Sequence, residues 1–498
     1  MAKRNRFFSH FSAAVILALI PVVPLAQVNE TTPNRFPFTR CASAARSYRR
    51  KTNAATIKPH DAESHFMQTP TSPELEESAD TSKGRSTIRY MSILLAVGWL
   101  GTNLAYNIAG IPFQLLLKNE MKLSAPEISA FMFWAMSLNY IKPFAGILTD
   151  SVPLFGTRRR SYLLISLTLC GLGWLLLSLV PRRYGILLTT YFLMYAMVVF
   201  ISTTLGGVMV EIGTRFKIAG RLTAQRIAMF KVGALFGSPL GGYLATRPFV
   251  LTASIVAGLH FMLIPFVFLR LKETRNVGIN REVWKDAGDQ LRGLVKNRTL
   301  LIAAVMICLI AIAPGFNTPL LFYQTDTLKF DPQFLGYLAF VHAAFGISAA
   351  VIYRWACVRL SLKTLITSSI IIHAVGTLFY LGYQSRGSAI AITALEGIAQ
   401  TLALLPVYDI AARATPKGSE ALGYSIMMSA WNLTGGLSDW TGSVIYSVFN
   451  LTFQNLVWLN SATTLLALIA VPMLPAVLLN QSDSAKTPPL SEEPDPPK

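Results

Sequence analysis

Apolar stretches of about twenty residues recur along the chain from Met91 onward, and short polar segments separate them. An α-helix rises about 1.5 Å per residue, so each stretch is long enough to cross the roughly 30 Å hydrocarbon core of a bilayer. The pattern contains twelve such stretches. It predicts transmembrane helices over residues 93–116, 128–148, 162–180, 185–208, 222–246, 250–270, 300–323, 333–353, 364–384, 388–411, 421–447 and 454–478.

The composition agrees with a chain whose main solvent is lipid. Hydrophobic residues make up 52% of the 498 residues and charged residues only 14%, whereas soluble proteins are roughly a quarter charged. This excludes an ordinary soluble enzyme, whose surface needs more charge. The sequence has no nucleotide-binding loop, metal-ligand cluster or nucleophile constellation, and its four cysteines lack the spacing of a metal site. We therefore expect a membrane protein that is not an enzyme and uses no cofactor or metal.

The formal net charge of +19 would suggest a nucleic-acid partner if the protein were soluble. Here one set of alternate loops carries 19 lysines and arginines, and the intervening loops carry seven. Cytoplasmic loops of membrane proteins are enriched in these residues. The charge therefore indicates an even number of spans with both termini in the cytoplasm, or in the stroma of a plastid, and no nucleic-acid partner.

Residues 1–89 differ from the rest of the chain because they are polar and rich in Ser, Thr, Ala and Pro. We expect them, and the tail over residues 480–498, to be disordered. A basic start, an apolar run from Phe11 to Ala26 and an acid-poor stretch after it are typical of bipartite targeting to a plastid envelope. The alternative is a later start at Met67, which favours a bacterial inner membrane.

The chain also divides into two halves of six spans joined by a long loop. The divisions fall at residues 90–270 for the N-terminal half, 271–299 for a cytoplasmic central loop and 300–479 for the C-terminal half. The first span of each half ends in a similar segment, Pro112–Lys122 in one half and Pro319–Lys329 in the other. Transporters built from such repeats bind their solute near the bilayer midplane, where the halves meet.

The loop after the second span resembles the G-x-x-x-D-R-x-G-R-R signature of the major facilitator superfamily, lengthened by insertions. Its members are Gly146, Asp150, Gly156, Arg158, Arg159 and Arg160. A glycine lets two helices approach closely, and an aspartate among arginines makes contacts that can differ between two conformations. We expect these residues to act as a gate, although the positive-inside rule accounts for part of the arginine run.

Longer segments in both halves resemble the folate-biopterin transporter family. They are residues 141–150, 155–162, Pro314, 322–323, 330–336, 416–421, 427–429 and 432–436, and the resemblance covers roughly residues 91–478. It implies a twelve-helix transporter, often proton-coupled, for folates, pterins or related solutes. Family members usually carry two aspartates four residues apart late in the fourth span, where this chain has Ser202 and Gly206. This departure puts the usual solute and coupling chemistry in doubt.

Charged side chains inside the spans indicate the solute site, because each is costly in lipid unless it faces a cavity or a partner. Lys231 and Lys142 lie about 13 Å and about 12 Å inside their spans, where they can pair with the carboxylates of an anionic solute. Arg226 lies only about one turn inside, so its side chain can also snorkel to the interface. The candidate solute-binding residues are Lys142, Lys231, Arg226 and Gln225, with Trp134 and Tyr140 placed either to stack on a flat ring or to pack helices.

Ion coupling needs a group that takes up and releases a proton, and buried carboxyls and histidines are suited to this task. The candidates are Glu396, Glu211, His342 and His373. By position Glu396 is the deepest of the acids. A histidine in a span has a second interpretation as a packed, hydrogen-bonded group.

The sequence therefore predicts an all-α polytopic membrane protein of the major facilitator type, with twelve transmembrane helices in two six-helix halves. We expect a monomeric secondary active transporter that moves a folate, a pterin or a related small organic anion with protons by alternating access. Two alternatives stay open, which are export of an unrelated metabolite and a membrane receptor or scaffold that does not transport. The intramembrane charges would converge on one cavity in a transporter and pair locally in a scaffold.

Overall fold

The computed structural model describes residues 82–216, 218–273, 281–415 and 420–474. Every helix or strand element within these ranges is a helix, apart from a single β-bridge between Leu154 and Thr157. The tail over residues 480–498 and nearly all of the N-terminal extension lie outside the described residues. The predicted all-α class is confirmed.

The N-terminal half is helical almost throughout. Its helices are α3 (Ser82–Leu115), α4 (Ala125–Ala135), α5 (Lys142–Ser151), α6 (Arg160–Leu179), α7 (Tyr184–Arg215), α8 (Ala219–Leu244) and α9 (Phe249–Arg270). Because α3 begins at Ser82, residues 82–89 are helical and the expectation of disorder was wrong for them.

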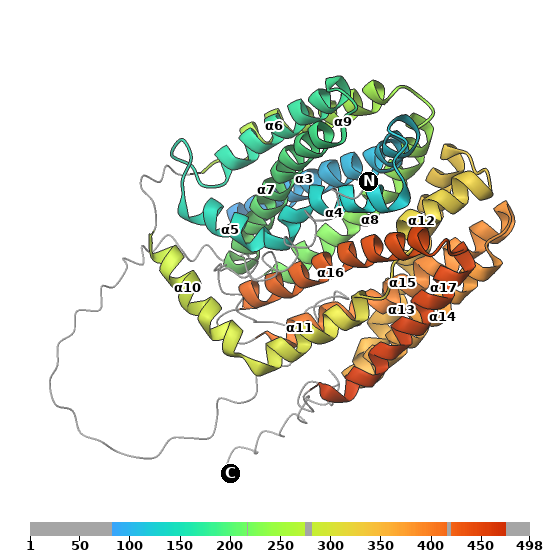
Figure 1. Ribbon diagram of the computed structural model, residues 1–498. Helices are drawn as coiled ribbons and strands as arrows, with labels where there is room; N and C mark the ends of the chain where they lie inside the picture. The colour runs from blue at the N-terminus through green and yellow to red at the C-terminus, as the bar shows by residue number, and fades with distance from the viewer. Residues whose placement is uncertain (1–81, 217, 274–280, 416–419, 475–498) are drawn as a thin grey trace, which may run out of the picture.

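The C-terminal half and the loop before it are also helical. Their helices are α10 (Arg281–Lys296), α11 (Arg298–Ala311), α12 (Asn317–Phe322), α13 (Pro332–Arg359), α14 (Leu362–Leu378), α15 (Arg386–Ala414), α16 (Glu420–Val448) and α17 (Phe453–Leu466). The helix α10 lies within the predicted central loop and packs against α5, where the rings of Trp284 and Phe144 are 5.8 Å apart. Figure 1 shows α10 beside α5 at one end of the bundle.

The count of twelve spans is not confirmed. Among the described residues, nine helices are long and apolar enough to cross a membrane, or ten if the bent pair of α10 and α11 is one span. The span predicted over 128–148 is broken into α4, a 3-10 turn and α5, which has Pro143 in its first turn. The span predicted over 300–323 is interrupted at Pro314, between α11 and α12. A proline removes one helical hydrogen bond and disfavours helix in the residue before it, which explains both breaks.

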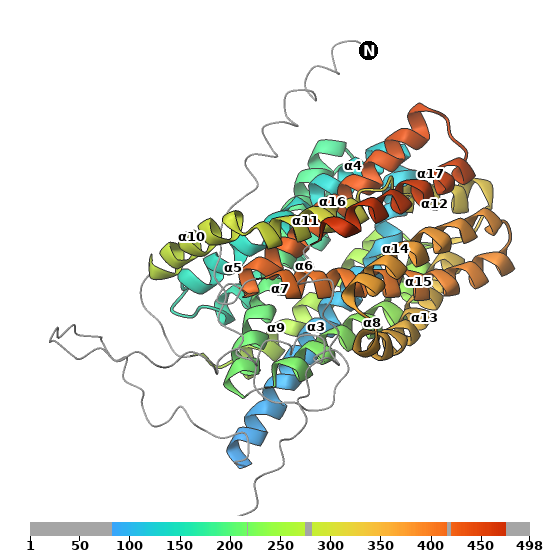
Figure 2. The same cartoon turned by 90° about the horizontal axis from the view of Figure 1, so that it is seen from below.

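Two groups of helices form the bundle. Figures 1 and 2 show α6, α7 and α9 on one side and α13, α14, α15 and α17 on the other. The groups meet where α8 packs on α13 and where α4 packs on α16. At the first crossing the two backbones touch, because a Cβ atom on Gly242 would lie 2.6 Å from the carbonyl oxygen of Pro332 and 2.9 Å from the Cα of Gly336. Only glycine fits this crossing.

The two similar segments found in the sequence adopt the same local structure. Each passes through a π-helix, at Leu116–Glu120 and at Tyr323–Thr327. Each then has a lysine in the left-handed region, with φ of 54° at Lys122 and 53° at Lys329. Such angles are uncommon outside glycine, so their repetition 207 residues apart supports a duplicated half.

The two ends of the bundle differ in charge. The segments around Arg158, Arg215 and Arg270 lie together, because Arg159 contacts Glu211 and Arg160 contacts the Phe268 carbonyl. We call this the basic end, and the charge pattern predicts that it faces the cytoplasm. The turns with Lys122 and Lys329 lie at what we call the opposite end.

Candidate functional site

Lys142 stands where the second span breaks. The 3-10 turn Ser137–Ile141 ends there and α5 begins, so the ammonium group reaches α7 and donates a hydrogen bond to the Ser202 hydroxyl at 2.6 Å. Family resemblance implies an aspartate at position 202. A hydroxyl carries no negative charge that would balance an ammonium group, and no carboxylate among the described residues forms an ion pair with Lys142.

Arg226 lies close to Lys142. Its guanidinium stacks over the rings of Trp99 and Phe230, at 4.5 Å and 5.2 Å from their centroids. The charge of Arg226 acts on Lys142, and the hydroxyls of Tyr408 and Tyr424 from the other half lie near enough to act on Arg226. Two basic side chains therefore lie near each other where the halves meet, with aromatic rings against Arg226.

Lys231 points toward a different part of the interface between the halves. A Cβ atom on Gly346 of α13 would lie 3.1 Å from its ammonium nitrogen. The charge of Lys231 acts on His342, whose side chain also lies within hydrogen-bonding reach of Gln400. The structure thus groups Lys142 with Arg226, and Lys231 with His342, whereas the sequence suggested that the two lysines act together.

The other candidate solute-binding residues contact protein groups. The Trp134 ring lies 5.2 Å from Phe133 and 6.4 Å from Trp440, which joins α4 to α16. The Tyr140 hydroxyl donates to the Phe133 carbonyl at 3.0 Å. Gln225 donates to the Ser92 carbonyl at 2.8 Å, on the side of α8 that faces α3. These placements favour the packing interpretation for both aromatic residues.

Two of the coupling candidates have unpartnered atoms inside the C-terminal half. Glu396 is buried, its Oε2 atom has no hydrogen-bond partner in the described part of the chain, and that oxygen would lie 3.2 Å from a Cβ on Gly376 of α14. The Nδ1 atom of His373, also in α14, likewise has no described partner. Glu211 is different, because its side chain is 60% exposed and forms an ion pair with Arg159 at 2.5 Å.

The predicted gate residues form a network within the N-terminal half. Arg159 contacts Asp150 at 3.5 Å in addition to Glu211. Burial raises the pKa of Asp150 above its ordinary value, while the charges of Arg159 and Arg158 act in the opposite direction. The remaining members are placed as follows: Gly146 is buried in α5, Gly156 turns the loop with φ of 80°, and Arg160 lies over the Phe268 ring at 4.5 Å.

Sequence reasoning missed Glu273 in this network. Its carboxylate accepts hydrogen bonds from the backbone N–H groups of Arg158, Arg159 and Arg160, at distances from 2.9 Å to 3.3 Å. These amides lie at the N-terminus of α6, where a negative charge is favoured by the helix dipole. In the sequence, Glu273 stands out only as an acid among basic residues. The amides that it binds lie more than a hundred residues earlier in the chain, so the sequence does not reveal the contact.

Sequence reasoning also missed a polar contact between the halves at the opposite end. Lys118 forms an ion pair with Asp326 and donates to the Thr325 hydroxyl at 2.5 Å. The Lys118 side chain is only 8% exposed and also lies over the Phe322 ring. We call this contact the Lys118 clamp. Lys118 and Thr325 are 207 residues apart, the spacing of the two repeats, so they are equivalent positions that touch across the axis relating the halves.

Two solved structures share this architecture. A D-xylose-proton symporter aligns with a TM-score of 0.60 and 14% sequence identity, over 80% of this chain and 99% of that protein. A variant of the nucleoside transporter NupG aligns with a TM-score of 0.61 and 13% identity, over 77% of this chain and 99% of that protein. The protein is therefore an integral, multi-pass membrane protein with the fold of major facilitator transporters.

The sequence places the protein more narrowly. A model of the BT1 family matches residues 104–488, and the chain belongs to that family. The folate-biopterin transporter of Synechocystis is 27% identical over 77% of this chain and 80% of its own length. The putative folate transporter 2 of Plasmodium berghei is 23% identical over 80% and 92%. The probable chloroplastic folate-biopterin transporter 9 of Arabidopsis thaliana is 27% identical over 63% of each chain. The resemblance seen in the sequence is confirmed, and these relatives are transporters rather than enzymes.

Proposed function

We propose that this protein moves folate, a pterin or a related small organic anion across a membrane by alternating access of its two halves. The names of the relatives and the fold of the solved transporters support this function. The observation that carries the choice of an anion is the meeting of Lys142 and Arg226 between the halves, without a described carboxylate to neutralise them.

The surroundings of this cation pair suit a solute with an acidic tail and a flat ring. Lys142 and Arg226 can each donate charge-assisted hydrogen bonds to a carboxylate. Trp99 and Phe230 lie against Arg226, and Tyr408 and Tyr424 approach it from the other half. Aromatic faces stack on heteroaromatic rings and on cations alike, so one site can hold both parts of the solute.

Proton coupling is a further part of the proposal. Glu396 supports it, because a buried carboxyl with an unpartnered oxygen avoids the energy of an isolated buried charge by holding a proton. His342 is the second candidate, because the charge of Lys231 acts on it and a bound anion would reduce that repulsion.

Transport by reconstituted protein tests the function. We expect proteoliposomes to accumulate labelled folate or biopterin, and we expect Lys142→Ala and Arg226→Ala to reduce uptake at least tenfold, because each removes a charged hydrogen-bonding group worth about 1.5–3 kcal/mol. Lys296→Ala is the matched control, since Lys296 is exposed on α10. Uptake no greater than in empty liposomes for both solutes would overturn the folate and pterin assignment.

One observation favours a different solute. Ser202 and Gly206 occupy positions where the family resemblance implies acids, and Ser202 is the residue that contacts Lys142. Export of another organic anion would leave folate unable to compete, whereas a receptor or scaffold would bind it without flux. Measuring folate binding and folate flux on the same protein separates these alternatives from the proposed transporter.

A further inference from the structure

A groove of about 640 Å³ lies between α3 and α8 at the basic end. The groove forms because α3 and α8 pack closely along part of their length and lie further apart at the basic end. Toward the opposite end, a Cβ on Gly233 or Gly237 would lie 2.8 Å from the Cβ of Asn103 or Asn107, so the helices are in close contact. Small residues allow such close approach. The series of glycines stops before the basic end, and the helices leave a groove there.

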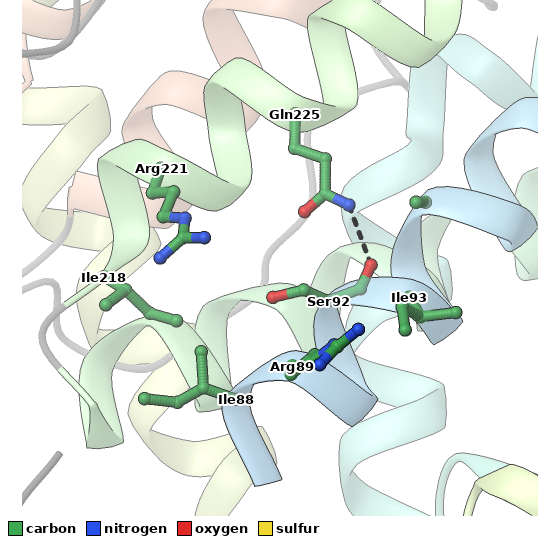
Figure 3. A pocket seen from close by; sticks show the side chains of 8 residues that line it. Ile88, Arg89, Ser92, Ile93, Ile218, Arg221 and Gln225 are labelled. Atoms are coloured by element: carbon green, nitrogen blue, oxygen red, sulfur yellow. Dashed lines mark hydrogen bonds between the residues drawn. The ribbon is translucent and has the colours of Figure 1, made fainter. Parts of the chain in front are cut away.

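Two arginines give the groove a positive charge. Arg89 lines it from α3 and Arg221 from α8, and both side chains are exposed. Figure 3 shows Arg221 extending from α8 toward α3. Among the residues that the structure describes, no acid lines the groove and neither arginine forms an ion pair. The groove therefore favours an anion.

The deeper part of the groove is apolar, with one polar contact. Ile93 and Ala96 of α3 contribute the apolar wall. Gln225 donates to the Ser92 carbonyl across the groove, as Figure 3 shows. This hydrogen bond occupies the amide group of Gln225, so Arg89 and Arg221 are the charged groups that can bind a ligand. A fitting ligand has an anionic head and an apolar body.

The position of the groove in the membrane selects the source of this ligand. Arg221 and Arg89 lie just before the apolar spans that the sequence predicts over residues 222–246 and 93–116. Both arginines are thus at the depth of lipid headgroups, while Ala96 lies about 10 Å further along the helix. A free anion would leave the apolar wall uncovered, whereas a phospholipid covers both parts.

We propose that this groove is a binding site for an anionic phospholipid from the leaflet at the basic end, with the headgroup phosphate between Arg89 and Arg221 and an acyl chain against Ala96. Basic pockets between transmembrane helices on the cytoplasmic side recognise anionic headgroups in this way. Neither Lys142 nor Arg226 lines the groove. The proposal does not depend on the identity of the transported solute.

Native mass spectrometry of the full chain in detergent tests the proposal, with phosphatidylglycerol, phosphatidylcholine and inorganic phosphate as probes. We expect Arg89→Ala and Arg221→Ala each to weaken phosphatidylglycerol binding about fivefold, and the double variant about 25-fold. The matched control is Lys296→Ala with Arg298→Ala, which removes two exposed cations of the same end outside the groove. Ala96→Phe fills the apolar part and should weaken the same lipid while the charge stays unchanged.

Three results would overturn the site. The first is equal phosphatidylglycerol binding by the double variant and by the control variant. The second is equal binding of phosphatidylcholine and phosphatidylglycerol. The third is displacement of the lipid by inorganic phosphate with no effect of Ala96→Phe, which would assign the groove to a soluble anion. Lys142→Ala should leave lipid binding unchanged, and this separates failure of the lipid site from failure of the solute site.

Discussion

The polar contacts at the two ends of the bundle join different parts of the molecule. At the opposite end, Lys118 of the N-terminal half pairs with Asp326 of the C-terminal half. At the basic end, Arg159 pairs with Asp150 and Glu211, which belong to the same half. The described ion pairs therefore hold the halves together at one end only. At the basic end, the described ion pairs connect residues of the same half.

This difference indicates how the halves can move. A rigid-body rocking motion separates the halves at one end and closes them at the other. The Lys118 clamp lies on the axis between the halves, so it must break whenever the opposite end opens. The network of Arg159 can stay intact throughout, because all its members move together. We infer that the structure is a conformation closed at the opposite end.

The largest expected effect comes from the backbone contact beside the clamp. Gly242→Leu places a side chain where a Cβ already lies 2.6 Å from the Pro332 carbonyl oxygen. The neighbouring atoms belong to the backbone and cannot move away as a side chain would. Overpacking costs about 1–3 kcal/mol, so the conformation closed at the opposite end should be disfavoured by about 5- to 150-fold. Spin labels on cysteines at positions 119 and 327, in a chain without its native cysteines, should report a larger separation between the halves.

Gly258→Leu is the control for that change. A Cβ on Gly258 meets nothing within 4 Å, although it is a helical glycine like Gly242. The distance between the labels should be the same as in the unsubstituted protein. An unchanged distance in Gly242→Leu as well would contradict the assignment of this crossing to the closed conformation.

The next effect concerns the clamp itself. Lys118→Ala removes the charge and its hydrogen bonds, but Asp326 is 56% exposed and screened by solvent, so we expect a shift of only about fivefold toward the open conformation. The same labels measure it. Arg182→Ala breaks the pair with Glu120 at the same end but within one half, and should not change the distance. A distance change in both variants would show that the clamp has no special role.

The sequence predicted the fold well where the signal was local. Hydropathy and length located the helices, and the matching Pro112–Lys122 and Pro319–Lys329 segments indicated a duplication that the π-helices and left-handed lysines support. The count of twelve spans is not confirmed, and three expected spans are absent from the nine apolar helices. Prolines break two of them, and the third, over residues 421–447, forms α16 but is less apolar than the nine. The helix α10 was missed because its polar residues were interpreted as a loop.

The candidate site was less predictable because its contacts join distant residues. Depth along a helix singled out Lys142 and Lys231, but it does not reveal which neighbours the two side chains face. The sequence grouped the two lysines, whereas Lys142 lies with Arg226 and Ser202. The clamp was visible in principle, since Lys118 and Thr325 share a repeat position, but contact across an axis requires the packed halves.

The smallest expected effect concerns the hydrogen bonds of Glu273 at the basic end. Glu273→Gln keeps an acceptor oxygen for the backbone amides of α6 but removes the charge, which is worth about 0.3–1 kcal/mol at a helix N-terminus. We expect the midpoint of thermal unfolding in detergent to fall by about 1–3 °C. The label distance at the opposite end should not change, because the described hydrogen bonds of Glu273 all go to the N-terminal half. A change in that distance equal to the one in Lys118→Ala would mean that the basic end also controls the closure of the halves.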